Sequence, residues 1–153
     1  MSFLGPPTDN YNSIKTPEFT ADGLCKSPWV CEHRWLEIRE MIKFRNVVGN
    51  SSVGNWADNG QNQLAFCRGN LGFIAFNNEL SLNFKANLQA CVPEGVYCDI
   101  ITGGKSAEGT CIGKEITVNA NGKADIVLPF YPYEYTAEPA GIPVIAIHIE
   151  SRL

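Results

Sequence analysis

The sequence predicts a mainly β protein: an antiparallel β-sandwich preceded by an irregular segment and one amphipathic helix. Two observations lead to this prediction. After residue 55, short apolar runs follow one another, separated by turn-forming residues, as in antiparallel sheets of about seven strands. Only the segment 32–48 has the three- and four-residue apolar spacing of a helix.

The first thirty residues are expected to be irregular. Prolines and glycines interrupt any apolar periodicity in this segment, at Gly5, Pro6, Pro7, Pro17, Gly23 and Pro28. From Glu32 to Val48 the apolar residues Trp35, Ile38, Met41 and Ile42 recur on one stripe, which predicts an amphipathic helix. Gly49 and Asn50 are expected to end it, since both residue types adopt the left-handed cap conformation at low cost.

Strands and turns are expected from about residue 55 onward. The run ELSLNFKANLQ, residues 79–89, alternates with period two and places one set of apolar side chains on one face: Leu80, Leu82, Phe84, Ala86 and Leu88. Shorter runs predict strands at Gln63–Cys67, Gly72–Phe76, Val96–Ile101, Glu115–Val118, Ala124–Leu128 and Val144–Ile149. The pair Asn121-Gly122 is the strongest hairpin signal between them.

Composition and charge exclude several classes of function. The chain has 153 residues, of which 44% are hydrophobic and 18% charged, so it can bury a core of its own. Its formal net charge is −4, and Lys and Arg are scattered, whereas nucleic acids and anionic membranes bind clustered basic surfaces. No stretch approaches the roughly 18 apolar residues that cross a bilayer. We therefore expect neither a nucleic acid nor a membrane as partner.

The cysteines indicate an oxidising compartment. There are six, and no spacing is the C-x-x-C of a zinc site, so a disulfide framework and a secreted, extracellular protein are favoured. The N-terminus, MSFLGPPTDN, has neither the basic nor the apolar region of a signal peptide. We expect the chain to be part of a larger precursor or to lack its true start. Asn50-Ser51-Ser52 is a candidate glycosylation site.

The segment WVCEHRW, residues 29–35, contains residue types that could perform catalysis. A nucleophilic Cys31 needs a base within hydrogen-bond reach, and His33 lies on a different side of a helical turn. A Cys25–Cys31 disulfide, which would fix the start of the helix, is the favoured interpretation. A metal site needs about three ligands, and His33 and His148 are the only histidines. The sequence therefore predicts no catalytic, cofactor-binding or metal-binding residue in this chain.

The acidic and aromatic residues leave one binding hypothesis open. Asp58, Asp99 and Asp125 fall at turns or on alternating strand positions, so we expect them to be solvated at the surface. Exposed rings could stack against sugars, and the candidates are Trp56, Tyr131, Tyr133 and Tyr135. The favoured alternative is that the tyrosine-rich loop folds back over the sandwich.

Four long strings resemble, in order, the C-terminal end of animal α-amylases. They are CKSPWVCEHRWLEIREMIKFRNVV (25–48), NWADNGQNQLAFCRGNLGFIAFNN (55–78), LQACVPEGVYCDIITGGK (88–105) and IPVIAIHIESRL (142–153). The resemblance implies a parent enzyme that hydrolyses internal α-1,4-glucosidic bonds of starch and glycogen. Its (β/α)8 barrel holds the catalytic carboxylates, calcium and chloride, and a Greek-key β-sandwich follows the barrel.

The resemblance also implies a division of this chain into two domains. Residues 1–54 resemble the end of the barrel, including its last helix at about 32–48, and residues 55–153 resemble the sandwich. The segments that bear the family's catalytic carboxylates and its calcium and chloride ligands have no counterpart here. The cofactors implied for the whole enzyme are thus not expected to bind to this chain, and the barrel is its expected intramolecular partner.

The cysteine pairing is inferred from the same resemblance. Cys25–Cys31 and Cys98–Cys111 match two disulfides of the family pattern. Cys67 and Cys91 fall where that pattern has small residues other than cysteine, and we expect them to form a third bridge. Two unpaired thiols are the alternative.

Two hypotheses of function follow. In the first, the chain is the C-terminal fragment of a secreted α-amylase, a partial or truncated form that supports the barrel and is inactive alone. The apolar stripe of the helix favours this hypothesis, because the stripe would need the barrel to bury it. In the second, the chain is a free-standing carbohydrate-binding module that uses Trp56 and the segment 131–135.

Overall fold

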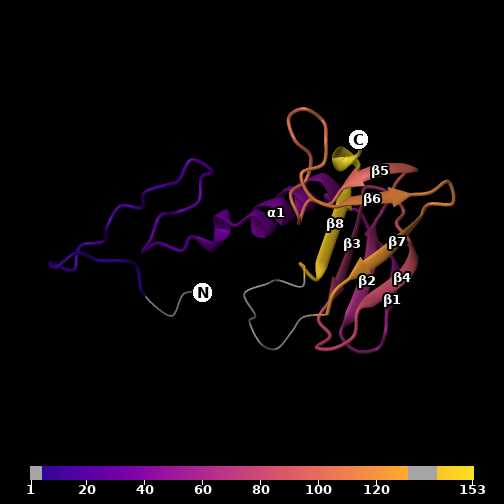
Figure 1. The fold of residues 1–153 in the computed structure, drawn as a ribbon, viewed down its shortest axis with the longest axis horizontal. Coiled ribbons are helices and arrows are strands. Elements are labelled where there is room, and N and C mark those ends of the chain that lie inside the picture. The colour runs from indigo at the N-terminus through magenta and orange to yellow at the C-terminus, as the bar shows by residue number, and fades with distance from the viewer. Residues whose placement is uncertain (1–4, 131–140) are drawn as a thin grey trace. The chain divides into compact units, whose positions relative to one another are not determined.

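The computed structural model describes residues 5–130 and 141–153. The helical elements are η1 (Glu32–Arg34, a 3-10 helix), α1 (Leu36–Val48) and η2 (Ile149–Ser151, a 3-10 helix). The strands are β1 (Val53–Asp58), β2 (Gln63–Arg68), β3 (Gly72–Asn77), β4 (Phe84–Gln89), β5 (Gly95–Cys98), β6 (Glu115–Val118), β7 (Lys123–Leu128) and β8 (Val144–His148) (Figure 1). The chain divides into two compact units, Met1–Arg39 and Glu40–Leu153.

Within the described residues, the N-terminal unit is irregular up to Cys31, as predicted for the first thirty residues. Its only β structure within the described residues is two isolated bridges, Thr8↔Ile14 and Phe19↔Cys25. The Arg34 guanidinium lies 4.2 Å from the centre of the Phe19 ring and donates a hydrogen bond to the Gly23 carbonyl at 3.0 Å. A cation over an aromatic face and a charged hydrogen bond thus link the loop to the helix start.

The α-helix begins later than the sequence predicts. Residues 32–34 form a 3-10 turn, and Trp35 then has a ψ of 144°, which breaks the helical path. Cys31, just before this turn, is held in the left-handed region at a φ of 51°. The first α-helical hydrogen bond runs from the Arg39 N–H to the Trp35 carbonyl at 2.9 Å. The predicted end is confirmed, with Gly49 at a φ of 51°.

The α1 helix has one buried apolar side and a second, exposed apolar side next to it. Phe44 and Val48 are buried, and they pack with Ile74 and Ala146 of the sheet. Successive helical residues are about 100° apart, so Ile38 and Ile42 project about 80–160° away from Phe44 and Val48, whereas Met41 lies beside them. In the predicted stripe, Trp35, Ile38 and Ile42 are 44%, 40% and 54% exposed. Only Met41 of the predicted stripe packs against the sandwich.

A four-stranded antiparallel sheet with the order β1-β2-β3-β8 forms one layer of the sandwich. Its register gives each face a separate set of side chains, because alternate residues of a strand point in opposite directions. Ile74 pairs with Ala146, and both point toward α1. The other face points into the main core with Ala65, Cys67, Phe73, Ala75, Ile145 and Ile147.

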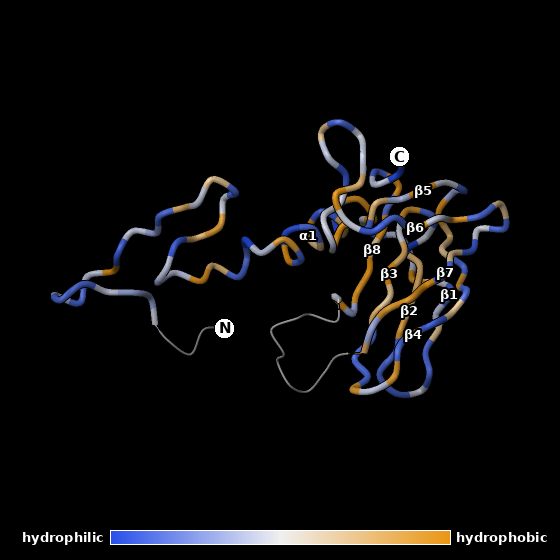
Figure 2. The backbone as a smooth tube through the Cα atoms, in the orientation of Figure 1, coloured by the Kyte–Doolittle hydropathy of each residue, from blue (hydrophilic) through white to orange (hydrophobic). Residues whose placement is uncertain are grey.

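Two strand pairs, β4–β7 and β5–β6, form the second layer. They bury Phe84, Tyr97, Ile116, Val118, Ala124, Ile126 and Leu128 in the same core. Figure 2 shows the apolar residues along β8, whereas the hairpin ends are hydrophilic. The predicted fold class, a mainly β chain with antiparallel sheets and one α-helix, is confirmed. The second layer differs from the expectation in being two separate pairs rather than one sheet.

The sequence analysis did not predict β1, and it placed the start of β4 too early. β1 has no alternating apolar pattern because its register shifts between Gly54 and Ala57, where a bulge interrupts the pleat. Leu80 and Leu82 precede β4 and are 55% and 57% exposed. The partner strand β7 ends at Leu128, since the next residue, Pro129, has no N–H to continue the ladder.

Substitutions at Phe44 and Ile42 test which side of α1 packs against the sheet. Phe44→Ala removes a buried ring from the helix–sheet interface and should lower the free energy of unfolding by about 3–5 kcal/mol. The control Ile42→Ala changes the exposed face and should alter it by no more than about 0.5 kcal/mol. Urea unfolding followed by circular dichroism measures both values. Equal losses in the two variants would contradict the assignment of faces.

Candidate functional site

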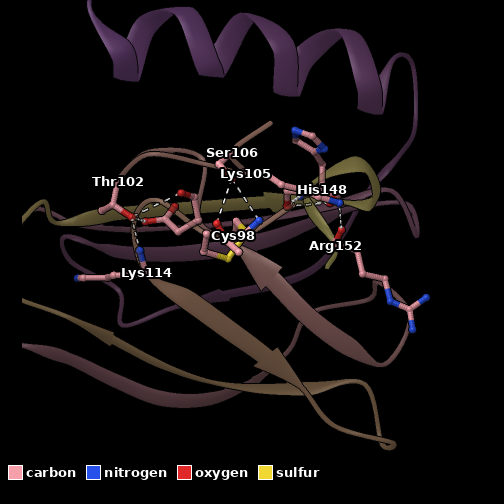
Figure 3. Close-up of a disulfide and its surroundings, with 11 residues drawn as sticks. Cys98, Thr102, Lys105, Ser106, Lys114, His148 and Arg152 are labelled. Carbon is pink, nitrogen blue, oxygen red and sulfur yellow. Dashed lines mark hydrogen bonds between the residues drawn. A yellow bond between two sulfur atoms is a disulfide. The ribbon is translucent and has the colours of Figure 1, made fainter. Parts of the chain in front are cut away.

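A cluster of polar side chains surrounds the Cys98–Cys111 disulfide at the end of β5 (Figure 3). Asp99 lies at its centre and is 0% exposed. Its Oδ1 accepts hydrogen bonds from the backbone N–H groups of Ile101 at 3.2 Å and Ala146 at 3.0 Å. Its Oδ2 accepts one from the Thr102 hydroxyl at 2.8 Å. Each carboxylate oxygen therefore has at least one protein donor.

Burial raises the pKa of the Asp99 carboxyl above its ordinary value of 3.8, although the three donors partly oppose this shift. The expectation of a solvated carboxylate at this position was therefore wrong. Period-two alternation did not predict the burial of Asp99, because the residue follows the last residue of β5, where the pleat ends. Asp58 and Asp125 are exposed, as expected.

The C-terminal residues are attached to the same region. The Lys105 ammonium donates to the Arg152 carbonyl at 2.8 Å, and the Leu153 N–H donates to the Val96 carbonyl at 2.9 Å. Thr102 also accepts a hydrogen bond from the Lys114 N–H at 2.9 Å. These contacts close the loop between β5 and β6 over the end of the sandwich, so the cluster acts as a structural junction.

His148 is the only buried histidine. It lies at the end of β8, is 6% exposed, and its side chain points toward the helix in Figure 3. Burial lowers the pKa of the imidazole below its ordinary value of 6.5. Its ring centre is 6.4 Å from that of Phe44, and its Nδ1 has no hydrogen-bond partner within the described residues. His33, by contrast, is exposed in the N-terminal unit.

The six cysteines form three disulfides, in the pairs that the sequence analysis expects. They are Cys25–Cys31, Cys67–Cys91 and Cys98–Cys111. The Cys67–Cys91 bridge joins β2 to the segment after β4, two residues beyond the strand end at Gln89. No thiol remains to act as a nucleophile.

The predicted sugar-stacking residues are only partly within the described chain. Trp56 is 59% exposed on β1. Its indole stacks on Phe66 with ring centres 5.7 Å apart and an interplanar angle of 13°, and its Nε1 donates to the Asp58 carboxylate at 2.6 Å. Tyr131, Tyr133 and Tyr135 lie outside the described residues. The structure thus fixes the orientation of one exposed ring.

The remaining candidates do not form a catalytic group. A cavity of about 380 Å³ in the N-terminal unit is lined by residues 5–7 and 28–33, but the sulfur of Cys31 in its wall is in a disulfide. Within residues 5–130 and 141–153, no three His, Cys, Asp or Glu side chains lie close enough together to hold a metal ion. In the same part of the chain, no helix has the length and apolar character to span a membrane.

Residues 54–135 match the family described as the α-amylase C-terminal all-β domain. The chain belongs to this family. Curated relatives include the α-amylase-related proteins of Drosophila willistoni, 44% identical, and Drosophila atripex, 43% identical, each over 148 residues. These matches cover 97% of this chain and 28% of each relative. The resemblance found in the sequence is confirmed, and the chain spans about 28% of the length of these relatives.

Solved structures give the same assignment. The chain is similar to α-amylase I of the earthworm Eisenia fetida, with a TM-score of 0.75 and 34% identity over 95% of this chain and 27% of the earthworm chain. An E249Q form of the same earthworm enzyme, in a maltohexaose complex, matches equally well. This chain is therefore a domain of an amylase-type protein.

Replacing Asp99 tests its structural role. Asp99→Ala leaves the buried amides of Ile101 and Ala146 without an acceptor and should cost about 2–6 kcal/mol of unfolding free energy. Asp125→Ala, an exposed control on β7, should change it by about 0.5 kcal/mol or less. Similar losses in both variants would contradict the role of Asp99.

The pH dependence gives a second readout of the same group. Because the pKa of Asp99 is raised in the folded chain, folding favours the protonated carboxyl. Its contribution to stability is therefore present below the ordinary value of 3.8 and is lost as the pH rises through the folded pKa. As the pH rises over this range, the unfolding free energy of the natural chain should fall relative to that of Asp99→Asn. A constant difference between the two would contradict the raised pKa of Asp99.

Proposed function

We propose that this chain is the C-terminal part of an α-amylase-type enzyme, in which it supports the catalytic barrel and has no hydrolytic activity of its own. The observation that carries the proposal is the second apolar face of α1. Phe44 and Val48 pack the helix against the sheet, and a separate side, about 120° around the helix, leaves Ile38 and Ile42 exposed to solvent. Complete burial of each isoleucine would contribute about 1.5–3 kcal/mol.

The two faces suit a helix shared between two domains. One face belongs to the sandwich, and the other would be covered by the barrel, so that the domains would be joined by a rigid element rather than by a flexible linker. The match to only 28% of the relatives' length supports a role for this chain within a larger protein.

The activity of the whole protein is part of the same proposal. It would be endo-hydrolysis of α-1,4-glucosidic bonds in starch or glycogen, with the catalytic carboxylates, calcium and chloride held by the barrel. Location outside the cell is supported by the three disulfides, which persist in oxidising compartments.

The test begins with the chain alone. It should release no reducing sugar from soluble starch, and hydrolysis by the pure chain would contradict the proposal. A chimera, in which this chain replaces the matching 27% of the earthworm α-amylase I, should fold and hydrolyse starch.

The same chimera tests the helix interface. The double change Ile38→Gln and Ile42→Gln should lower the thermal midpoint of the chimera by several degrees, because the barrel would then cover two polar amides. In the isolated chain, where both positions are exposed, the midpoint should hardly change. Equal effects in both proteins would contradict burial by the barrel.

A second candidate function is carbohydrate binding, and Trp56 favours it. Stacking on Phe66 and the Nε1 hydrogen bond to Asp58 hold the exposed indole in one orientation. A ring held rigidly loses little conformational entropy when a sugar stacks on it. This arrangement suits the flat apolar face of a glucose unit.

Trp56→Ala should reduce retention of the chain on insoluble starch at least tenfold, whereas Val127→Ala, which changes another exposed strand residue, should leave retention unchanged. A pull-down with quantified bound fractions measures both. The combined change of Tyr131, Tyr133 and Tyr135 to alanine tests the rest of the predicted platform. Equal retention of the natural chain and Trp56→Ala would exclude a platform at Trp56.

A further inference from the structure

We infer that Asn50 is a site of N-linked glycosylation, displayed on a fixed surface turn at the C-terminal end of α1. Asn50-Ser51-Ser52 is the only Asn-x-Ser/Thr sequence in the 153 residues. A three-residue pattern has little weight by itself. The position of Asn50 in the fold and the disulfides of the same domain are the further evidence for glycosylation at this site.

The side chains of the acceptor and of the hydroxyl residue are accessible. Gly49, with a φ of 51°, ends the helix and turns the chain outward, and both Asn50 and Ser52 are exposed. The Asn50 Oδ1 lies 3.5 Å from the Arg45 Nη2. The Asn50 Nδ2, the atom that would be glycosylated, makes no hydrogen bond within the described residues. The reacting nitrogen therefore faces solvent without a competing partner.

The backbone of the same turn is held at three points. The Ser51 N–H donates to the Val48 carbonyl at 3.0 Å, and the Gly69 N–H donates to the Ser52 carbonyl at 2.8 Å. The Arg68 Nε donates to the Ser51 carbonyl at 3.0 Å. A sugar on Asn50 would thus project from a rigid turn, and no core side chain would have to move to accommodate it.

The reaction transfers a preassembled oligosaccharide from a lipid-linked pyrophosphate donor in the secretory pathway. A bond forms between the Asn50 Nδ2 and the anomeric carbon of the first sugar. The bond from that carbon to the pyrophosphate oxygen breaks, the lipid pyrophosphate leaves with the electron pair, and the Nδ2 loses one proton. The three disulfides support passage through this pathway, because it is also where such bonds form.

The test is translation of the 153-residue chain, fused to a secretion signal, in a cell-free system with microsomes. The product should show one discrete increase in mass that an endoglycosidase removes. Asn50→Gln and Ser52→Ala should abolish the increase. Ser51→Ala should retain it, because the middle position of the sequence accepts most residues. This readout does not depend on folding, since glycan transfer precedes it.

The surface position is tested on the purified glycosylated protein. The endoglycosidase should release the glycan from the native, disulfide-bonded protein as completely as from the unfolded one. Absence of a mass increase in the natural chain would overturn the inference, as would an increase that persists in Asn50→Gln. Resistance of the native glycoprotein to the enzyme would overturn the exposed placement.

Discussion

The hydrogen bonds accepted by the Asp99 carboxylate join segments that the strand ladders leave separate. Among the described strands, the ladders pair β5 with β6 and β8 with β3. The Asp99 carboxylate accepts a hydrogen bond from the Ala146 N–H in β8, and the Ile100 N–H donates one to the Ala146 carbonyl at 3.0 Å. The free edge of β8 is thereby covered, which removes an unpaired strand edge. The disulfide Cys98–Cys111 closes the adjoining loop and contributes about 3 kcal/mol through the entropy of the unfolded chain.

The position of the helix depends on this junction. Once Asp99 turns the chain across β8, Ile100 and Ile101 are buried with Phe44 and Val48 on the outer face of the sheet. Together with Ile74 and Ala146 of the sheet, these four side chains form a second, smaller core on the side of the sheet that faces α1. One side of α1 thereby packs against the sandwich, whereas the side with Ile42 stays exposed, where another domain can cover it. The proposed supporting role rests on this arrangement.

The sequence predicted the features that depend on local patterns. Strict alternation located β4 from Phe84 onward, and the glycine at position 49 located the helix end, because each signal acts within a few residues. The bulge in β1 and the burial of Asp99 escaped prediction, since both are decided by partners distant in the chain, such as Ala146. Among the candidate site residues, sequence identified Trp56 and Asn50 by type. Only the structure gives the Phe66 stacking and the Gly69 hydrogen bond that fix their surroundings.

Asp99 and His148, two of the buried ionisable groups in the sandwich, show why a perturbed pKa here does not by itself indicate catalysis. A general acid or base must reach the reacting atom of its substrate. The raised pKa of Asp99 arises from burial, and its oxygens already accept three protein hydrogen bonds. The lowered pKa of His148 arises from burial as well, with Phe44 beside its ring. Both shifts are consequences of packing between β8, the β5–β6 loop and α1.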